Sequence, residues 1–112
     1  MDLPVDVSIL IPTCRRPALL ERTLESLVAR RASPITHEIL VIDNVGDHDT
    51  RRVLDAIADR FPIRLLTEMR RSKNRALLRG LEEAAGDLLV FTDDDVVVDN
   101  DWLTEIVEGA RR

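Results

Sequence analysis

Apolar residues along the chain alternate between short continuous runs and longer segments in which they recur every three or four positions. The runs VDVSILI (5–11), HEILVID (37–43), PIRLL (62–66) and DLLVFT (87–92) are typical of strands that are covered on both faces. The segment after each run predicts a helix with one apolar stripe. The four stripes are Leu20, Thr23, Leu24, Leu27 and Val28; Val53, Leu54, Ile57, Ala58 and Phe61; Leu77, Leu78, Leu81, Ala84 and Ala85; and Trp102, Leu103, Ile106, Val107 and Ala110.

Three residues near the ends of these segments indicate helix boundaries. Pro17 suits the first turn of the first helix, because the N–H group that proline lacks would have no helical partner there. Gly86 is expected to close the third helix, and Asn100 is expected to cap the fourth.

Strands that alternate with helices through short connections imply right-handed crossovers and a mostly parallel sheet. The sequence therefore predicts an α/β protein with three layers, α/β/α, around a Rossmann-like sheet of about four strands, in a single domain over residues 1–112. Sheets of this kind bind ligands outside the carboxyl ends of their strands. The segments at those ends are PTCRRP (12–17), DNVGDHDT (43–50), TEMRRSKNR (67–75) and TDDD (92–95).

Composition and charge exclude several classes of function. The chain has 112 residues, a net charge of -5 and no tyrosine, and no basic stripe is interleaved with aromatic residues, so we expect no nucleic-acid partner. The one cysteine, Cys14, cannot form an internal disulfide, and no apolar run approaches the roughly 18 residues of a membrane helix. We therefore expect a cytoplasmic location and no membrane segment in this chain.

Three consecutive carboxylates, Asp93, Asp94 and Asp95, follow the fourth predicted strand. In an extended chain the first and third project to one side, about 6.5–7 Å apart. With no Lys or Arg nearby in sequence, this spacing suits a hard divalent cation, Mg²⁺ or Mn²⁺, which takes one or two carboxylates and completes its shell with water and phosphate oxygens. A solvated acidic turn before the next helix is the alternative. Zinc is not expected, because His37, His48 and Cys14 have no ligand spacing.

Five sequence blocks follow one another along the chain and together cover essentially all of it: VSILIPTCRRP, LLERTLESLVA, EILVIDN, AAGDLLVFTDDD and DWL. In this order they resemble the nucleotide-binding half of the family 2 glycosyltransferases, which have the GT-A fold. The resemblance implies a domain that binds a nucleotide diphosphate sugar, with a UDP-sugar favoured, through Mn²⁺ or Mg²⁺, and that supports glycosyl transfer to an acceptor of unknown identity.

The resemblance also implies roles for individual residues. Pro12 and Thr13 would line the nucleotide pocket, and Asp43 would accept a hydrogen bond from the base, although an Asx turn that closes the strand explains Asp43 equally well. Of the acidic triplet, Asp93 would hold the ribose or share the metal and Asp95 would coordinate it. The same resemblance makes Asp94 a substitute nucleotide or metal contact. Arg75 is the arginine of the third loop that we expect at the phosphates, with a solvated basic face as its alternative.

The chain also departs from the family pattern. Cys14 stands where relatives usually have an aromatic residue, and we interpret it as pocket lining; Val45 to His48 replace the usual Gly-Ser-acid sequence. Leu77 and Leu78 replace an Arg-Asn pair.

No residue is identified as the general base, since the acceptor half of such enzymes is absent from this sequence and Asp99 and Asp101 suit a helix start. We therefore expect a chain that binds nucleotide with metal but transfers sugar poorly by itself.

Two other classes of function stay open. One is a non-catalytic nucleotide-binding or assembly module, with an exposed apolar face that a homo-oligomer would bury. The other is a phosphoacceptor signalling domain, which has this length and a parallel sheet. That class needs acids at the end of the first strand, where PTCRRP has none.

Overall fold

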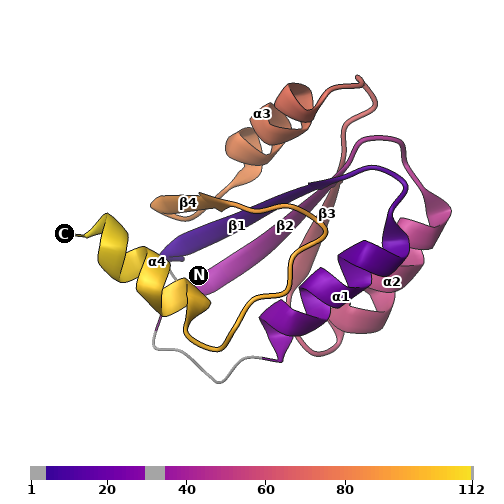
Figure 1. The fold of residues 1–112 in the computed structure, drawn as a ribbon. Coiled ribbons are helices and arrows are strands. Elements are labelled where there is room, and N and C mark those ends of the chain that lie inside the picture. The colour runs from indigo at the N-terminus through magenta and orange to yellow at the C-terminus, as the bar shows by residue number, and fades with distance from the viewer. Residues whose placement is uncertain (1–4, 30–34, 112) are drawn as a thin grey trace.

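The computed structural model describes residues 5–29 and 35–111, so the ends of the predicted 1–112 domain lie outside the described residues. Strands and helices alternate along the chain, as predicted (Figure 1). No helix among the described residues has both the length and the apolar composition needed to cross a membrane. In chain order the elements are β1 (Val7–Thr13), α1 (Pro17–Val28), β2 (His37–Asp43), α2 (His48–Ala58), β3 (Ile63–Thr67), α3 (Lys73–Glu83), β4 (Leu88–Phe91) and α4 (Trp102–Ala110).

The four strands form one sheet in the order β3-β2-β1-β4, and each neighbouring pair is parallel. β1 lies in the middle, with Val7 opposite His37 of β2 on one side and opposite Leu88 of β4 on the other. The chain therefore builds outward from β1 to β3 and then crosses back to place β4 on the other side of β1. The carboxyl ends of β1 and β4 meet at this reversal of strand order, which is where ligands bind in open parallel sheets.

Helices cover both faces of the sheet, which confirms the three-layer prediction. Figure 1 shows α3 alone on one face and α1, α2 and α4 on the other. Two groups of buried residues correspond to these faces. The group under α3 is Leu10, Leu40, Ile42, Leu66 and Ala76, and the larger group on the opposite face is Val7, Ile9, Ile11, Leu20, Leu24, Leu27, Ile39, Val41, Leu54, Ile57, Val90, Leu103 and Val107.

The predicted apolar stripe of the third helix was wrong. α3 buries Ala76 and Gly80, whereas Leu78 and Leu81 are 55% and 40% exposed. The reason is the short distance between the α3 backbone and the sheet. A Cβ atom on Gly80 would overlap Leu10 Cδ2 and lie 3.0 Å from Ile42 Cδ1, so the backbone of α3 itself packs on the sheet. Small residues therefore set the rotation of α3. Ala58 and Ala110 of the other predicted stripes are also exposed.

The predicted helix boundaries had mixed outcomes. Pro17 is the first residue of α1, as expected. Gly86 does not close α3, which ends at Glu83; instead it lies against β1, where an added Cβ would be 2.6 Å from the Ser8 backbone nitrogen. Asn100 is not the cap of α4 either, because the N-cap position belongs to Asp101.

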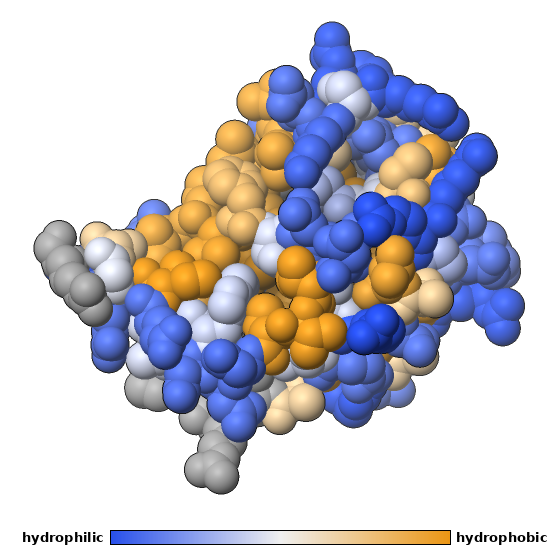
Figure 2. Space-filling model, in the orientation of Figure 1, coloured by the Kyte–Doolittle hydropathy of each residue, from blue (hydrophilic) through white to orange (hydrophobic). Residues whose placement is uncertain are grey.

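Apolar side chains are exposed along the β4 side of the sheet. Phe91 of β4 is 51% exposed, and Leu78 and Leu81 lie on the neighbouring α3. Figure 2 shows apolar atoms gathered on this side of the molecule, between α3 and α4. An exposed apolar face was expected from the sequence, and β4 is an edge strand with one paired neighbour.

Replacing Gly80 with alanine tests the close packing of α3. We expect Gly80→Ala to lower the free energy of unfolding by about 1–3 kcal/mol, because the added methyl group must displace Leu10. Gly109→Ala is the matched control: no atom lies within 4 Å of its added Cβ, so alanine should stabilise α4 by about 0.5–1 kcal/mol. Urea denaturation of both variants measures the difference, and equal effects would contradict the packing argument.

Candidate functional site

A cavity of about 390 Å³ opens where β1 and β4 end side by side. The connections that follow three strands contribute to its walls, together with the first residue of α3, so it lies at the edge of the sheet where the sequence predicted a site. Its lining residues are Pro12, Thr13, Cys14, Arg16, Asn44, Lys73, Asp93, Asp94 and Asp95.

Asp94 ties the loop after β4 to the end of β1. Its carboxylate accepts a hydrogen bond of 2.8 Å from the Thr13 hydroxyl, and both residues are 4% exposed. Arg16 Nη1 lies 3.3 Å from the same carboxylate. Because the chain turns at Asp94 and Asp95 instead of continuing as a strand, the alternation expected for an extended chain does not apply to the triplet.

The other two aspartates also have basic partners, which sequence proximity did not indicate. Asp95 lies 3.1 Å from Arg16 Nη2, and Asp93 lies 3.0 Å from Lys73 Nζ. These partners are 79 and 20 residues away along the chain. Arg15, just before Arg16, adopts a left-handed φ of 54° within the bend that follows β1. The absence of Lys or Arg nearby in sequence therefore does not leave the triplet without positive partners, because the fold supplies them.

The two outer carboxylates suit a metal ion that needs few protein ligands. No group of three or more His, Cys, Asp or Glu side chains within residues 5–29 and 35–111 is placed to hold an ion, so these residues do not form a complete cage. Asp93 and Asp95 nevertheless line the cavity with side chains that are 60% and 45% exposed, and their oxygens are hard ligands. Mg²⁺ and Mn²⁺ fit this donor set, because they use one or two carboxylates together with water and phosphate oxygens.

Asp43 and Arg75 do not line the cavity. Asp43 is 1% exposed, and its two carboxylate oxygens accept hydrogen bonds from the backbone N–H groups of Val45 (3.0 Å) and Asp47 (2.7 Å). These hydrogen bonds form the Asx-type turn that the sequence analysis gave as the alternative explanation of Asp43. Arg75 lies on the exposed part of α3, and its backbone N–H donates to the Ser72 hydroxyl. The nucleotide-binding roles of Asp43 and Arg75 stay predictions.

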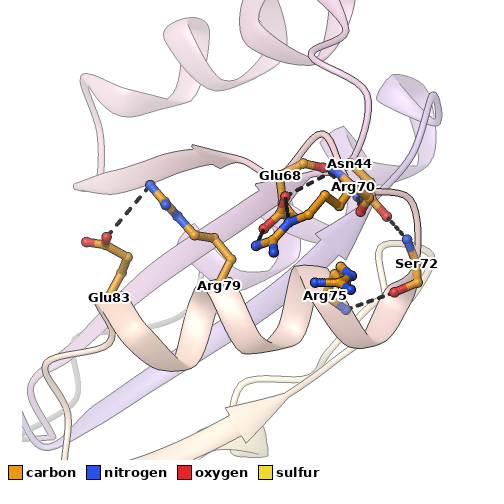
Figure 3. A network of polar contacts seen from close by, with 7 residues as sticks. All are labelled: Asn44, Glu68, Arg70, Ser72, Arg75, Arg79 and Glu83. Carbon is orange, nitrogen blue, oxygen red and sulfur yellow. Dashed lines mark hydrogen bonds and ion pairs between the residues drawn. The ribbon is translucent and has the colours of Figure 1, made fainter.

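Asn44 holds the loop between β3 and α3 in place (Figure 3). Its side-chain amide donates to the backbone carbonyls of Glu68 (2.5 Å) and Arg70 (2.9 Å), and its oxygen accepts from the Ser72 N–H group (3.2 Å). Ser72 in turn caps α3 through the N–H group of Arg75. Asn44 therefore fixes where α3 begins, and with it the position of Lys73 at the cavity.

Glu68 forms a second fixed contact in this loop. It is 7% exposed and accepts hydrogen bonds from Arg70 Nη2 (2.7 Å), Arg70 Nε (3.1 Å) and the Arg70 backbone N–H (3.1 Å). Figure 3 shows the Arg70 side chain turned back over this carboxylate. The hydrogen bonds from the Arg70 guanidinium, followed by the one from its backbone, hold the pKa of Glu68 at about 2, below its ordinary 4.5.

Sequence reasoning missed Arg16, Lys73 and Asn44 as residues of the site. Each lies in a segment predicted at the carboxyl end of a strand, close in sequence to the residues that were predicted for the site. The signal for Asn44 was its place directly after the aspartate that ends β2, since Asn side chains readily bond nearby backbone groups.

Comparisons with known proteins agree with the fold and identify a family. The family model described as "Glycosyl transferase family 2" matches residues 8–112. Among characterised proteins, ExoM of Rhizobium meliloti (strain 1021), a succinoglycan biosynthesis protein, is 33% identical over 97% of this chain and 35% of its own length. RfbC of Myxococcus xanthus, an O-antigen biosynthesis protein, is 32% identical over 95% of this chain and 8% of its own length.

Solved structures agree with the fold. The mannosyltransferase PcManGT from Pyrobaculum calidifontis, in complex with GDP-Man and Mn²⁺, is 25% identical with a TM-score of 0.83, over 95% of this chain and 32% of that one. S. aureus TarS in complex with UDP-GlcNAc is 18% identical with a TM-score of 0.78, over 93% of this chain and 30% of that one, and supports the fold alone. The chain thus spans about a third or less of these four proteins.

The Glu68–Arg70 contact should make stability depend on pH. Because the folded-state pKa of Glu68 is about 2 and its ordinary value is 4.5, its contribution is complete above pH 4.5 and is lost as the pH falls toward 2. We expect Glu68→Gln to be less stable than the parent chain at about pH 7 and the difference to shrink on acidification. Urea denaturation of both proteins across this pH range is the measurement. A stability difference that stays constant with pH would contradict the assignment.

Asn44→Ala should destabilise the loop before α3. Asn44 is 9% exposed, and its removal leaves backbone groups of Glu68, Arg70 and Ser72 without their partner. We expect a loss of at least about 1–3 kcal/mol in the free energy of unfolding. The exposed Asn74 provides the control, since Asn74→Ala should change stability by less than about 0.5 kcal/mol. Similar losses in the two variants would remove the anchoring role from Asn44.

Proposed function

The chain belongs to glycosyl transferase family 2, and from this premise we propose that its cavity binds the nucleoside diphosphate part of a sugar donor. The observation that carries the proposal is the position of the cavity. It lies at the reversal of strand order between β1 and β4, with carboxylates from the loop after β4 on one side and the end of β1 on the other.

The polar and apolar walls of the cavity suggest how the donor is oriented. Pro12, Thr13 and Asn44 come from the ends of β1 and β2 and would contact the nucleoside. Asp94, which is tied to Thr13, would keep this wall rigid next to the ribose and the phosphates. Asp93 and Asp95 would hold the divalent cation. When bound there, Mn²⁺ or Mg²⁺ supplies positive charge where the departing diphosphate gains negative charge.

Asp43 is our proposed contact for the base, although its carboxylate already accepts the backbone hydrogen bonds of a turn. Each of its carboxylate oxygens accepts one backbone hydrogen bond, and an ionised carboxylate has further acceptor capacity. Its chain neighbour Asn44 lines the cavity, so Asp43 is the residue next to the cavity wall along the chain. Arg75 is a weaker candidate for the phosphates, because Lys73 and not Arg75 lines the cavity.

The share of its relatives that the chain spans supports a donor-binding role within a larger transferase. We assign the general base and the acceptor site to no described residue, and we expect the 112-residue chain to bind the donor while transferring sugar poorly. UDP is the favoured nucleotide from the resemblance in the sequence. GDP is the comparison to make, since PcManGT was solved with GDP-Man.

Calorimetric titration of UDP and GDP, with and without Mn²⁺, tests this function. We expect Mn²⁺-dependent binding that Asp95→Asn weakens at least about tenfold, or about 1.4 kcal/mol, because a metal ligand is lost. Asp101→Asn removes an equal charge outside the cavity and should change binding by less than about 0.5 kcal/mol.

Two results would count against this assignment. Equal binding by the parent chain and Asp95→Asn would remove the metal role from Asp95. Nucleotide binding that does not depend on Mn²⁺ would favour a non-catalytic binding module.

A further inference from the structure

We propose that Arg16 and Lys73 are exchangeable cations of the cavity. When a divalent cation binds Asp95 and Asp93, Arg16 and Lys73 would separate from these carboxylates and contact the diphosphate of the donor instead. The inference rests on the donor-binding function proposed above. It assigns a phosphate-binding role to two residues that neither the sequence pattern nor the family resemblance singled out.

Both side chains are placed where the exchange requires them to be. Arg16 reaches the cavity from the loop after β1, and Lys73 reaches it from the start of α3. They approach the same acidic loop from different elements, Arg16 at 3.1 Å from Asp95 and Lys73 at 3.0 Å from Asp93. Any diphosphate bridged to these carboxylates by a metal ion would therefore lie within reach of both cations.

The Lys73–Asp93 and Arg16–Asp95 ion pairs are exposed contacts that break easily, whereas the second contact of Arg16 is with Asp94, whose side chain is 6% exposed. The Lys73 and Asp93 side chains are 64% and 60% exposed, and those of Arg16 and Asp95 are 44% and 45% exposed. Exposed pairs of this kind contribute little to stability, because water competes for both charges. The Glu68–Arg70 contact differs, since its carboxylate is buried and receives three N–H groups.

The charge of the cavity explains why the exchange would need metal and nucleotide together. Three carboxylates and two cations line it, so its net charge is negative and it repels a diphosphate. A divalent cation arriving alone must compete with Lys73 and Arg16 for Asp93 and Asp95. Binding of metal and diphosphate together would remove both unfavourable interactions. The carboxylates would then be neutralised by the metal, and Arg16 and Lys73 would pair with the phosphates.

The charges at the helix N-termini beside the cavity also favour an anionic ligand. Arg16 is the N-cap residue of α1 and Lys73 is the first residue of α3, and neither helix has an acidic residue in its first turn. α2 and α4 start away from the cavity and carry Asp49 and Glu105 there. A cation at a helix N-terminus is disfavoured by the helix dipole, whereas an anion is favoured. Two cations at two such ends are therefore placed for an anionic ligand.

The substitution Lys73→Met distinguishes an exchangeable ion pair from a purely structural one, because methionine keeps an aliphatic side chain and removes the charge. Mn²⁺ binding without nucleotide, measured from the electron paramagnetic resonance of free Mn²⁺, should become about two- to fivefold tighter when the competing cation is gone. UDP binding at saturating Mn²⁺, measured by calorimetry, should become about tenfold weaker or more, since a charged phosphate contact is lost. Arg16→Met should give the same pair of opposite changes.

Arg71→Met is the control for net charge, because Arg71 is an exposed residue of the same loop that does not line the cavity. It should change neither affinity by more than about twofold. Circular dichroism establishes that each variant is folded before binding is measured.

Each outcome decides between the possibilities. If the parent chain binds Mn²⁺ and UDP but both cavity variants weaken both ligands, or change neither, the cations are structural and the exchange is refuted while the donor site stands. If the parent chain binds neither UDP nor GDP with Mn²⁺, the proposed function fails and the exchange fails with it. Opposite changes in the two affinities support the exchange.

Discussion

β4 pairs with β1 and not with β3, so the chain must cross the sheet between its third and fourth strands. This reversal places the loop after β4 next to the end of β1, and the buried hydrogen bond from Thr13 to Asp94 fixes the two together. The cavity, its acidic wall and the basic side chains that face it all depend on this arrangement. A sheet with the strands in chain order would put β2 and β3 between β1 and β4, and the acidic loop would no longer meet Thr13.

The site combines rigid contacts with loose ones. Asp94, Asn44 and Glu68 are buried and hydrogen-bonded, and they hold the loops that form the cavity. The Arg16–Asp95 and Lys73–Asp93 ion pairs are exposed, so water and ligands compete for them, although Arg16 also contacts the buried Asp94. This combination suits the proposed binding of a charged donor, because rigid walls would preserve the shape of the cavity while weakly held charges rearranged around the ligand.

Packing between α3 and the sheet brings the start of that helix to the cavity. Ala76 and Gly80 are small enough for the helix backbone to approach Leu10 and Ile42. The same rotation leaves Leu78 and Leu81 of α3 exposed, and Figure 2 shows an apolar surface between α3 and α4. The rotation of one helix thus accounts both for Lys73 at the site and for the exposed apolar side chains.

The sequence by itself determined the alternation of strands and helices, the three layers, the edge of the sheet that carries the site, and the family. These features depend on local apolar periodicity and on short motifs, which can be read without knowing which strands are neighbours. The tertiary structure decided the partners of the acidic triplet, the rotation of α3 and the close approach of Gly86 to β1. Each of these depends on contacts between residues far apart in the chain, such as Arg16 and Asp95, and no local pattern specifies them.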